Sequence, residues 1–275
     1  MNYTAMTHDQ IKQAAPSVFA SRPFHEVSEK YAFIPTIRIL EGLEREGFGV
    51  FKARQSNTRI EGKKPFVKHA LRLRHLGDMG KEVGGSVPEI ALGNDHAGGG
   101  ALVFDAGIFE VLCQNGLVAA KEKFANIRIR HQGDDIINRV IEGAFQVVQD
   151  FGRVIEVRDH WKSIRLDHDE KLAFASAAHV LKWKPTLDEE GNELHKFDSE
   201  KLLMVRRPEE LKDDLWTTFN VVQENMIKGG LDYVMENKNG KVRKMTTRGI
   251  KSVADDNRVN QALWLLADKM AELKA

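Results

Sequence analysis

The sequence contains a single cysteine, Cys113, among its 275 residues. One cysteine excludes an intrachain disulfide framework and a zinc site built from several cysteines. No run approaches the roughly 20 apolar residues that a membrane-spanning helix needs. Polar residues also interrupt residues 1–20 throughout, which does not match a signal peptide. These absences predict a cytoplasmic protein that does not associate with membranes.

Sequence motifs of common catalytic and nucleotide-binding sites are missing as well. The chain has no GxxxxGKS/T, GxGxxG, HExxH or GxSxG pattern. An excess of one charge is missing too, because 41 lysines and arginines stand against 40 acidic residues. We therefore expect no catalytic site, no metal and no cofactor, and any attraction to nucleic acid must come from local patches.

The order of predicted elements indicates an α+β fold. An antiparallel β-meander of four to five strands is followed by a long helix and a helical C-terminal part. Alternation of apolar and polar residues predicts the strands, and their short connections favour antiparallel pairing. The strands are predicted over residues 48–54, 70–75, 87–92, 101–112 and 126–131. We expect an N-terminal arm or helix over 1–30, the meander and long helix over 31–165, and the helical part over 166–275, with the option of one continuous domain.

Capping and turn residues refine this outline. Thr36 is predicted to cap a helix, and Pro208 to start one that points Leu211, Leu215, Phe219 and Val222 inward. Gly229 and Gly230 are predicted to end that helix. Asn115-Gly116 predicts a hairpin turn. Further helices are predicted over 135–157, 169–182 and 256–273, and a loop or hairpin over 236–251.

Basic residues are concentrated in two segments. Residues 52–75 contain eight lysines and arginines against Glu61 alone, and residues 238–251 contain six with no acidic residue. On the predicted strands, Arg72 and Arg74 alternate with leucines, and Arg128 and Arg130 alternate with isoleucines. If the two strands are neighbours, their arginines form a positive track with a spacing suited to the phosphates of a single strand. The alternative is an ordinary solvated face, and the nearby aromatics are few.

Histidines, glycines and the cysteine offer weaker candidates. His96 with Asp95 could belong to a metal site, and the glycine-rich residues 93–100 could contact a phosphate. No pair of histidines has a recognised ligand spacing, so hydrogen-bonded histidines and a simple turn are favoured. For Cys113, a buried structural role is favoured over a reactive one.

Several segments, in order along nearly the whole chain, resemble the phage-, prophage- and plasmid-borne family called domain of unknown function 932, which includes the UPF0380 proteins. The resemblance implies a mobile-element context rather than a reaction. The segments are Ser28–Thr36, Lys68–Arg74, Asn94–His96, Cys113–Leu117, Ile129–Glu142, Phe219–Gly230 and Thr247–Ala267.

Three functions remain in competition. The first is binding or annealing of single-stranded nucleic acid, DNA above all, in recombination or replication; the predicted meander and helix are similar to the core of single-strand annealing proteins. The second is a protein-binding module that inhibits a host defence or nuclease complex, and the third is an enzyme acting on nucleotides or nucleic acid. A homo-oligomer and a host protein partner stay open. The residues predicted to contact nucleic acid are Lys63, Lys64, Lys68, Arg72, Arg74, Arg128, Arg130, Arg243, Lys244 and Arg248.

Overall fold

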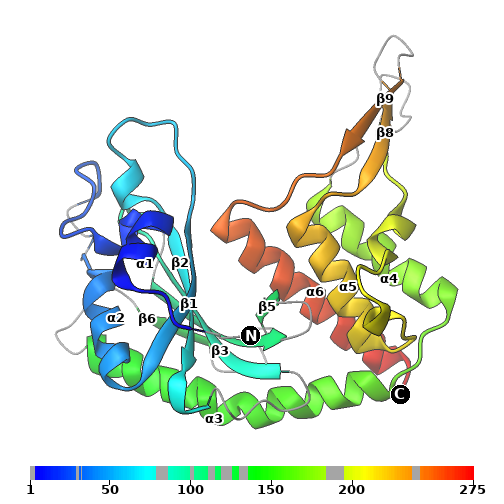
Figure 1. Ribbon diagram of the computed structural model, residues 1–275, viewed down its shortest axis with the longest axis horizontal. Coiled ribbons are helices and arrows are strands. Elements are labelled where there is room, and N and C mark those ends of the chain that lie inside the picture. The colour runs from blue at the N-terminus through cyan, green and yellow to red at the C-terminus, as the bar shows by residue number, and fades with distance from the viewer. Residues whose placement is uncertain are drawn as a thin grey trace. The chain divides into compact units, whose positions relative to one another are not determined.

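The computed structural model forms two compact units (Figure 1). The first unit comprises Met1–Ile155 with Lys251–Ala254, and the second comprises Glu156–Ile250 with Asp255–Ala275. No helix among the described residues is both long and apolar enough to cross a bilayer. The structure describes residues 4–28, 31, 33–78, 86–99, 102–110, 115–118, 126–129, 136–183, 195–236 and 242–275.

The first unit is built on an antiparallel sheet, which confirms the predicted α+β class and meander. The strands follow the order β1-β2-β3-β4-β5, and β6 pairs with β4. One end of β4 pairs with β5 and the other end with β6. The sheet therefore has six strands, one more than expected. They are β1 (Phe48–Gln55), β2 (His69–His75), β3 (Ser86–Asn94), β4 (Leu102–Glu110), β5 (Asn115–Val118) and β6 (Asn126–Ile129).

The extra strand corrects the prediction of a turn at Asn115-Gly116. These residues pair instead with Glu110 and Phe109 of β4. The edge of β4 offers main-chain hydrogen bonds there, and pairing outweighs the turn preference of an Asn-Gly dipeptide.

Helices of the first unit cover the sheet and its edge (Figure 1). Their apolar residues, such as Ile39, Leu40 and Leu43, are fully buried with Leu71 and Leu73 of the sheet. The N-terminal arm is anchored by the hydrogen bond from the Met6 amide to the Val50 carbonyl. The elements are α1 (His8–Ala14), η1 (Pro16–Phe19), α2 (Thr36–Arg45), η2 (Lys64–Phe66), η3 (Leu76–Asp78) and the first part of α3 (Ile136–Ser163).

Thr36 is the first residue of α2, and its side chain does not cap the helix. It lies instead in a fully buried polar cluster with His69, Asn94 and His96. Thr36 Oγ1 lies 2.8 Å from His69 Nε2, 3.0 Å from His96 Nε2 and 2.9 Å from Asn94 Nδ2. The prediction that Thr36 caps the helix is therefore wrong, because its hydroxyl is already hydrogen-bonded to these three side chains.

The neighbouring carbonyls fix the proton positions in this cluster. The Val67 carbonyl accepts from His69 Nδ1, so His69 Nε2 is the acceptor of the Thr36 hydroxyl proton. The Ile34 carbonyl can only accept, so His96 Nε2 carries a proton, which the Ile34 carbonyl and Thr36 Oγ1 share. With the donation from Asn94, the hydroxyl gives one hydrogen bond and accepts two, its full capacity. The cluster thus ties α2 to the ends of β2 and β3.

The second unit consists of helices with a small three-stranded sheet, in the order β7-β8-β9. The Leu166 amide, just before the helix that starts at His168, donates to the Asp213 carbonyl, just before the helix that starts at Leu215. The elements are the end of α3, α4 (His168–Lys182), β7 (His195–Lys196), η4 (Ser199–Leu203), η5 (Pro208–Glu210), α5 (Leu215–Lys228), β8 (Asp232–Glu236), β9 (Val242–Thr246) and α6 (Val253–Leu273).

Four aromatic rings form the core of this unit. Trp161 of α3 lies 4.7 Å from Trp264 of α6 and 5.5 Å from Phe219 of α5, measured between ring centroids. Trp216 lies 5.7 Å from Phe219. All four side chains are at most 3% exposed. Aromatic rings packed at these distances bury large apolar areas and fix the relative positions of the three helices.

The helix predicted from Pro208 begins seven residues later. Pro208 starts only the short turn η5, and Asp214 caps α5 by accepting from the Thr217 amide. Leu211, predicted to point inward, is 72% exposed. The Asp214 carboxylate supplies the cap that Arg207, at the corresponding place before Pro208, cannot provide. Gly229 ends the helix with a positive φ, as predicted.

The buried histidine gives a prediction for the stability of the first unit. Burial, together with the nearby His96, lowers the pKa of His69 to about 3. Below the ordinary pKa near 6.5 the unfolded chain takes up a proton that folded His69 refuses, so the folded state loses stability as pH falls. Between pH 7.5 and 5.5 we expect the free energy of unfolding to fall by about 1.4 kcal/mol.

Hydrogen exchange of the β2 and β3 amides measures this loss within the first unit. His69→Gln should flatten the pH dependence, whereas His25→Gln, at a side chain that is 79% exposed, should leave it unchanged. A pH dependence that persists in His69→Gln would contradict the assignment.

Candidate nucleic-acid interface

Arg72 and Arg74 of β2 do not face solvent, which corrects the expectation of an exposed basic strand. They are 8% and 4% exposed, and both pair with Glu89 of β3, which is 2% exposed. Arg74 Nε and Nη2 both lie 3.1 Å from Glu89 Oε2, and its guanidinium lies 4.4 Å from the centroid of Phe51. A buried carboxylate is strongly destabilising unless cations pair with it, so these two arginines stabilise the sheet by pairing with Glu89.

The two arginine-bearing strands are also not neighbours. Strands β3 and β4 separate β2 from β6. Three strand spacings amount to about 14 Å, too wide for one continuous row of guanidinium groups. Arg128 lies in β6 opposite Val103, and Arg130 lies outside the described residues. The condition on which the predicted track depended is therefore not met.

The connection between β1 and β2 retains an accessible basic surface. Lys64 is exposed, and Lys63 and Lys68 are partly exposed. Lys63 Nζ lies 5.3 Å from the ring centroid of Phe24, which packs at 5.6 Å from the ring of Phe66. This segment of the first unit can attract phosphates, with one partly exposed aromatic ring beside its lysines.

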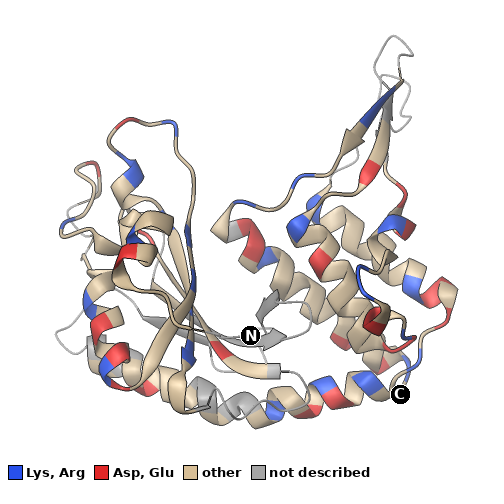
Figure 2. Ribbon diagram, in the orientation of Figure 1, with Lys and Arg blue, Asp and Glu red and all other residues tan. Residues whose placement is uncertain are grey.

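Three more of the predicted residues lie on and after the β8–β9 hairpin. Arg243, Lys244 and Arg248 are all exposed, and no carboxylate of the described residues lies within ion-pair distance of them. Lys244 is opposite Val234 in register, and Val234 is 40% exposed. Figure 2 shows this basic run along β9 and the segment that follows it.

An aromatic cluster that the sequence did not reveal lies beside this hairpin. Trp183 and Phe197 stack with ring centroids 4.9 Å apart and an angle of 24° between their planes. Tyr233 of β8 contacts Phe197 at 6.2 Å, and His179 contacts both stacked rings. All four side chains are partly exposed. Because these residues are distant in the chain, no local pattern brings them together.

Lys182 joins the aromatic cluster to the basic segment. Its Nζ lies 4.4 Å from the Trp183 centroid and donates to the carbonyls of Met226 and Arg248. Burial lowers its pKa to about 8, so the ammonium remains mostly charged at neutral pH. The Arg248 backbone is thereby held near Trp183.

Gly229 allows the same segment to approach the end of α5. A Cβ at this position would lie 2.7 Å from the backbone of Thr247, Arg248 and Gly249. The Gly230 amide donates to the Thr247 carbonyl, and the Ile250 amide donates to the Ile227 carbonyl. The two glycines therefore have two roles. They end the helix, as the sequence predicted, and they hold the backbone of Arg248 close to its end.

The other candidates from the sequence have structural partners. Asn94 and His96 belong to the buried Thr36 cluster, and Asp95 Oδ1 accepts from the Ala97 amide. In the part of the chain that the structure describes, no three His, Cys, Asp or Glu residues are grouped to hold a metal ion. Cys113 lies outside that part.

The ion cluster of the sheet predicts a strong effect of one substitution. Glu89→Gln would remove the buried charge that contacts both Arg72 and Arg74, and removal of one partner of a buried ion pair costs about 3–5 kcal/mol. Urea unfolding followed by circular dichroism measures the loss. Glu41→Gln, at an exposed position of α2, is the control and should change stability by at most about 0.5 kcal/mol. Equal stability of the two variants would contradict the role of Glu89.

Comparisons with known proteins agree with the resemblance drawn from the sequence. The profile of the family "Domain of unknown function (DUF932)" matches residues 23–264. Two proteins of Escherichia coli K12, "UPF0380 protein YafZ" and "UPF0380 protein YfjQ", are each 37% identical over 265 residues, covering 96% of this chain and 91% of theirs. No solved structure matches the chain. The chain belongs to the DUF932 family.

Proposed function

We propose that the protein binds single-stranded nucleic acid through a surface of the second unit, here called the hairpin surface. Its cations are Lys182, Arg243, Lys244 and Arg248, and its aromatic rings are Trp183, Phe197 and Tyr233. The observation that carries the proposal is the link that Lys182 makes: its ammonium contacts the ring of Trp183 in a partly exposed aromatic stack and donates to the main-chain carbonyl of Arg248. Arg248 is exposed and has no acidic partner among the described residues.

The chemistry of single strands suits this combination. Basic side chains attract the phosphates, and unpaired bases stack on aromatic rings with about 1–3 kcal/mol per base, with little dependence on sequence. A duplex hides its base faces, so the aromatic rings favour a single strand. The lysines of the β1–β2 connection, Lys63, Lys64 and Lys68, add a second basic surface on the first unit.

The proposal excludes Arg72 and Arg74, whose guanidinium groups already pair with Glu89 in the sheet. It includes annealing of complementary DNA strands in recombination or replication as the biological outcome. Annealing requires no catalytic residue, because a protein that concentrates and aligns two strands lets base pairing supply the free energy. Acceleration of annealing between labelled complementary oligonucleotides tests this part separately from binding.

Fluorescence anisotropy with a labelled single-stranded oligonucleotide, titrated at several salt concentrations, tests binding. A single strand gives a log–log salt slope of about −0.7 per phosphate contact. The triple variant Arg243→Ala, Lys244→Ala, Arg248→Ala should therefore lose about 2 from the magnitude of the slope. A matched triple, Lys12→Ala, Arg22→Ala, Lys212→Ala, removes the same charge from other exposed positions and should retain the slope. Equal slopes in the two triples would contradict the assigned surface.

Tryptophan fluorescence tests the aromatic part of the surface. Three of the four tryptophans are at most 3% exposed, and only Trp183 is partly exposed. A stacked base should quench Trp183, and Trp183→Phe should abolish the quenching while the fold is retained. Quenching that survives in Trp183→Phe would place the strand elsewhere.

A further inference from the structure

The connection between β1 and β2 carries a concentration of positive charge on the first unit. Residues 56–68, here called the basic loop, hold four lysines and arginines against Glu61 alone. Arg59 and Lys64 are exposed, and Lys63 and Lys68 are partly exposed. None of these four cations lies within ion-pair distance of a carboxylate of the described residues. The loop therefore presents a net positive surface to solvent (Figure 2).

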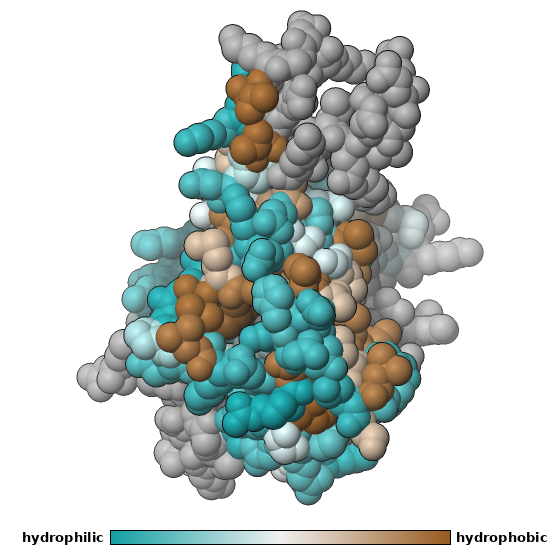
Figure 3. Space-filling model, turned by 90° about the vertical axis from the view of Figure 1, so that its right-hand side faces the viewer, coloured by the Kyte–Doolittle hydropathy of each residue, from teal (hydrophilic) through white to brown (hydrophobic). Residues whose placement is uncertain are grey.

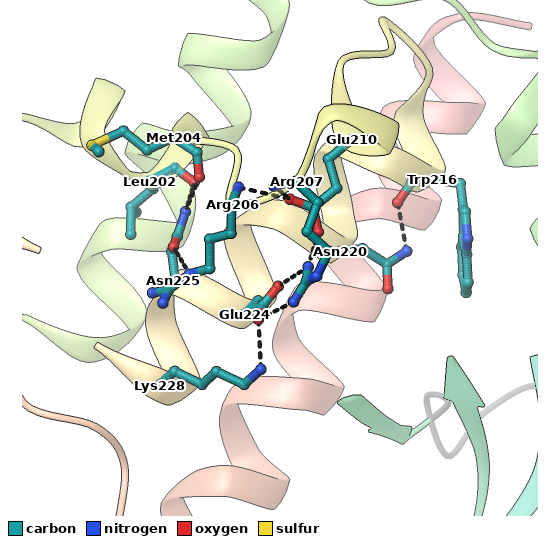
Figure 4. A network of polar contacts seen from close by, with 10 residues as sticks. All are labelled: Leu202, Met204, Arg206, Arg207, Glu210, Trp216, Asn220, Glu224, Asn225 and Lys228. Atoms are coloured by element: carbon teal, nitrogen blue, oxygen red, sulfur yellow. Dashed lines mark hydrogen bonds and ion pairs between the residues drawn. The ribbon is translucent and has the colours of Figure 1, made fainter. Parts of the chain in front are cut away.

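Several cations elsewhere in the chain are neutralised by carboxylates. In the second unit Arg207 and Lys228 both pair with Glu224, and Arg207 also pairs with Glu210 (Figure 4). In the sheet of the first unit, two arginines of β2 pair with Glu89. Such pairs cancel the charge locally, whereas the basic loop keeps a positive potential that attracts a polyanion.

Hydrogen bonds fix the path of the basic loop. The Ser56 amide donates to the Lys68 carbonyl at 2.8 Å, which closes the base of the loop. Gln55 Nε2 donates to the Lys64 carbonyl, and Gln55 Oε1 accepts from the Ser17 amide. The backbone that carries the cations is therefore held in place, so little backbone entropy is lost when a ligand binds.

The basic loop offers little surface on which bases can stack. Phe66 is its one aromatic residue. The ring of Phe66 is partly exposed and packs 5.6 Å from the ring of Phe24. The Phe66 carbonyl accepts from the His96 amide, which fixes this part of the loop. Proteins that bind single strands stack successive bases on several rings, so the loop lacks the feature that favours a single strand.

Exposed apolar side chains are also scarce on the basic loop. Ile60 is 54% exposed, whereas Val67 is buried. Exposed apolar residues such as Met204 and Leu211 belong to the second unit, and Figure 3 shows apolar patches bordered by hydrophilic side chains. One exposed apolar residue is ordinary on a protein surface. The loop therefore does not have the apolar area that docks a protein or inserts into a membrane.

We propose that the basic loop binds the phosphate backbone of double-stranded nucleic acid. A duplex carries about one negative charge per 1.7 Å of its axis, twice the density of one of its strands. A site that offers cations without a platform for stacking gains most from that density. Phosphate contacts carry no sequence information, so we expect binding that does not depend on sequence. The basic loop shares no residue with the hairpin surface, and the inference stands if that surface binds no single strand.

Fluorescence anisotropy with a labelled blunt-ended duplex, titrated at several salt concentrations, tests the proposal. Each contact with a duplex phosphate contributes about −0.9 to the log–log salt slope. The loop triple Arg59→Ala, Lys64→Ala, Lys68→Ala should therefore lose about 2.7 from the magnitude of the slope. The control triple at the exposed residues Lys12, Arg22 and Lys212 removes the same charge and should retain the slope. Equal slopes in the two triples would overturn the proposal.

A single strand of the same length separates this site from the hairpin surface. The loop triple should lose more affinity for the duplex than for the single strand, and a saturating single strand should still quench Trp183 in it. A larger loss for the single strand would overturn the proposal. Tighter binding of polyglutamate, or of vesicles of phosphatidylglycerol and phosphatidylcholine, than of the duplex would also overturn it. Absence of Trp183 quenching in the unaltered protein would contradict the hairpin surface alone, because the duplex measurement does not involve that ring.

Discussion

Helix α5 is the element on which the second unit depends, because it is buried on nearly every side. From Leu215 to Met226 only Thr217 is not buried. One side packs Phe219 against tryptophans of α3 and α6. The other side carries Glu224 and Asn225, which bind the segment before α5, and its C-terminal end receives Lys182 and the Thr247–Gly249 backbone. A single helix thus positions both the segment before it and the hairpin surface.

Buried polar groups have a similar role in the first unit. The Thr36 hydroxyl and its three partners connect α2 to two strands, and Glu89 connects β3 to two arginines of β2. A shift of the strands would break these buried hydrogen bonds and ion pairs, so they favour one register of the sheet over its alternatives. The residues that the sequence suggested for chemistry, His96 and Arg72 among them, serve this architecture.

Much of the fold could be predicted from periodicity, because alternation and helical spacing report burial directly. The strands near 48–55, 69–75, 86–94, 102–110 and 126–129 and helix α4 were predicted close to their observed bounds. Local preferences failed where tertiary contacts outweighed them, as with Asn115-Gly116 in β5 and Thr36 in the buried cluster. The prediction that Leu211 points inward was wrong because its apolar character was taken to mean burial, whereas the residue is 72% exposed.

The candidate site could be predicted only in part. Arg243, Lys244 and Arg248 are recognisable as a basic segment without acidic residues, and the structure leaves them exposed. Arg72 has the same alternating pattern as an exposed strand residue, and only the position of Glu89 on the next strand reveals its burial. The stack of Trp183 on Phe197 depends on residues from separate elements, and no local signal predicts it.

Ultraviolet cross-linking of a single-stranded oligonucleotide, followed by mass spectrometry of the cross-linked peptides, locates the bound strand on the protein. We expect cross-links on the peptides that contain Trp183, Phe197 or Tyr233, and their loss when unlabelled single strand is added. Such cross-links would support binding at the hairpin surface. Cross-links confined to peptides of the first unit, or none from a bound strand, would contradict it.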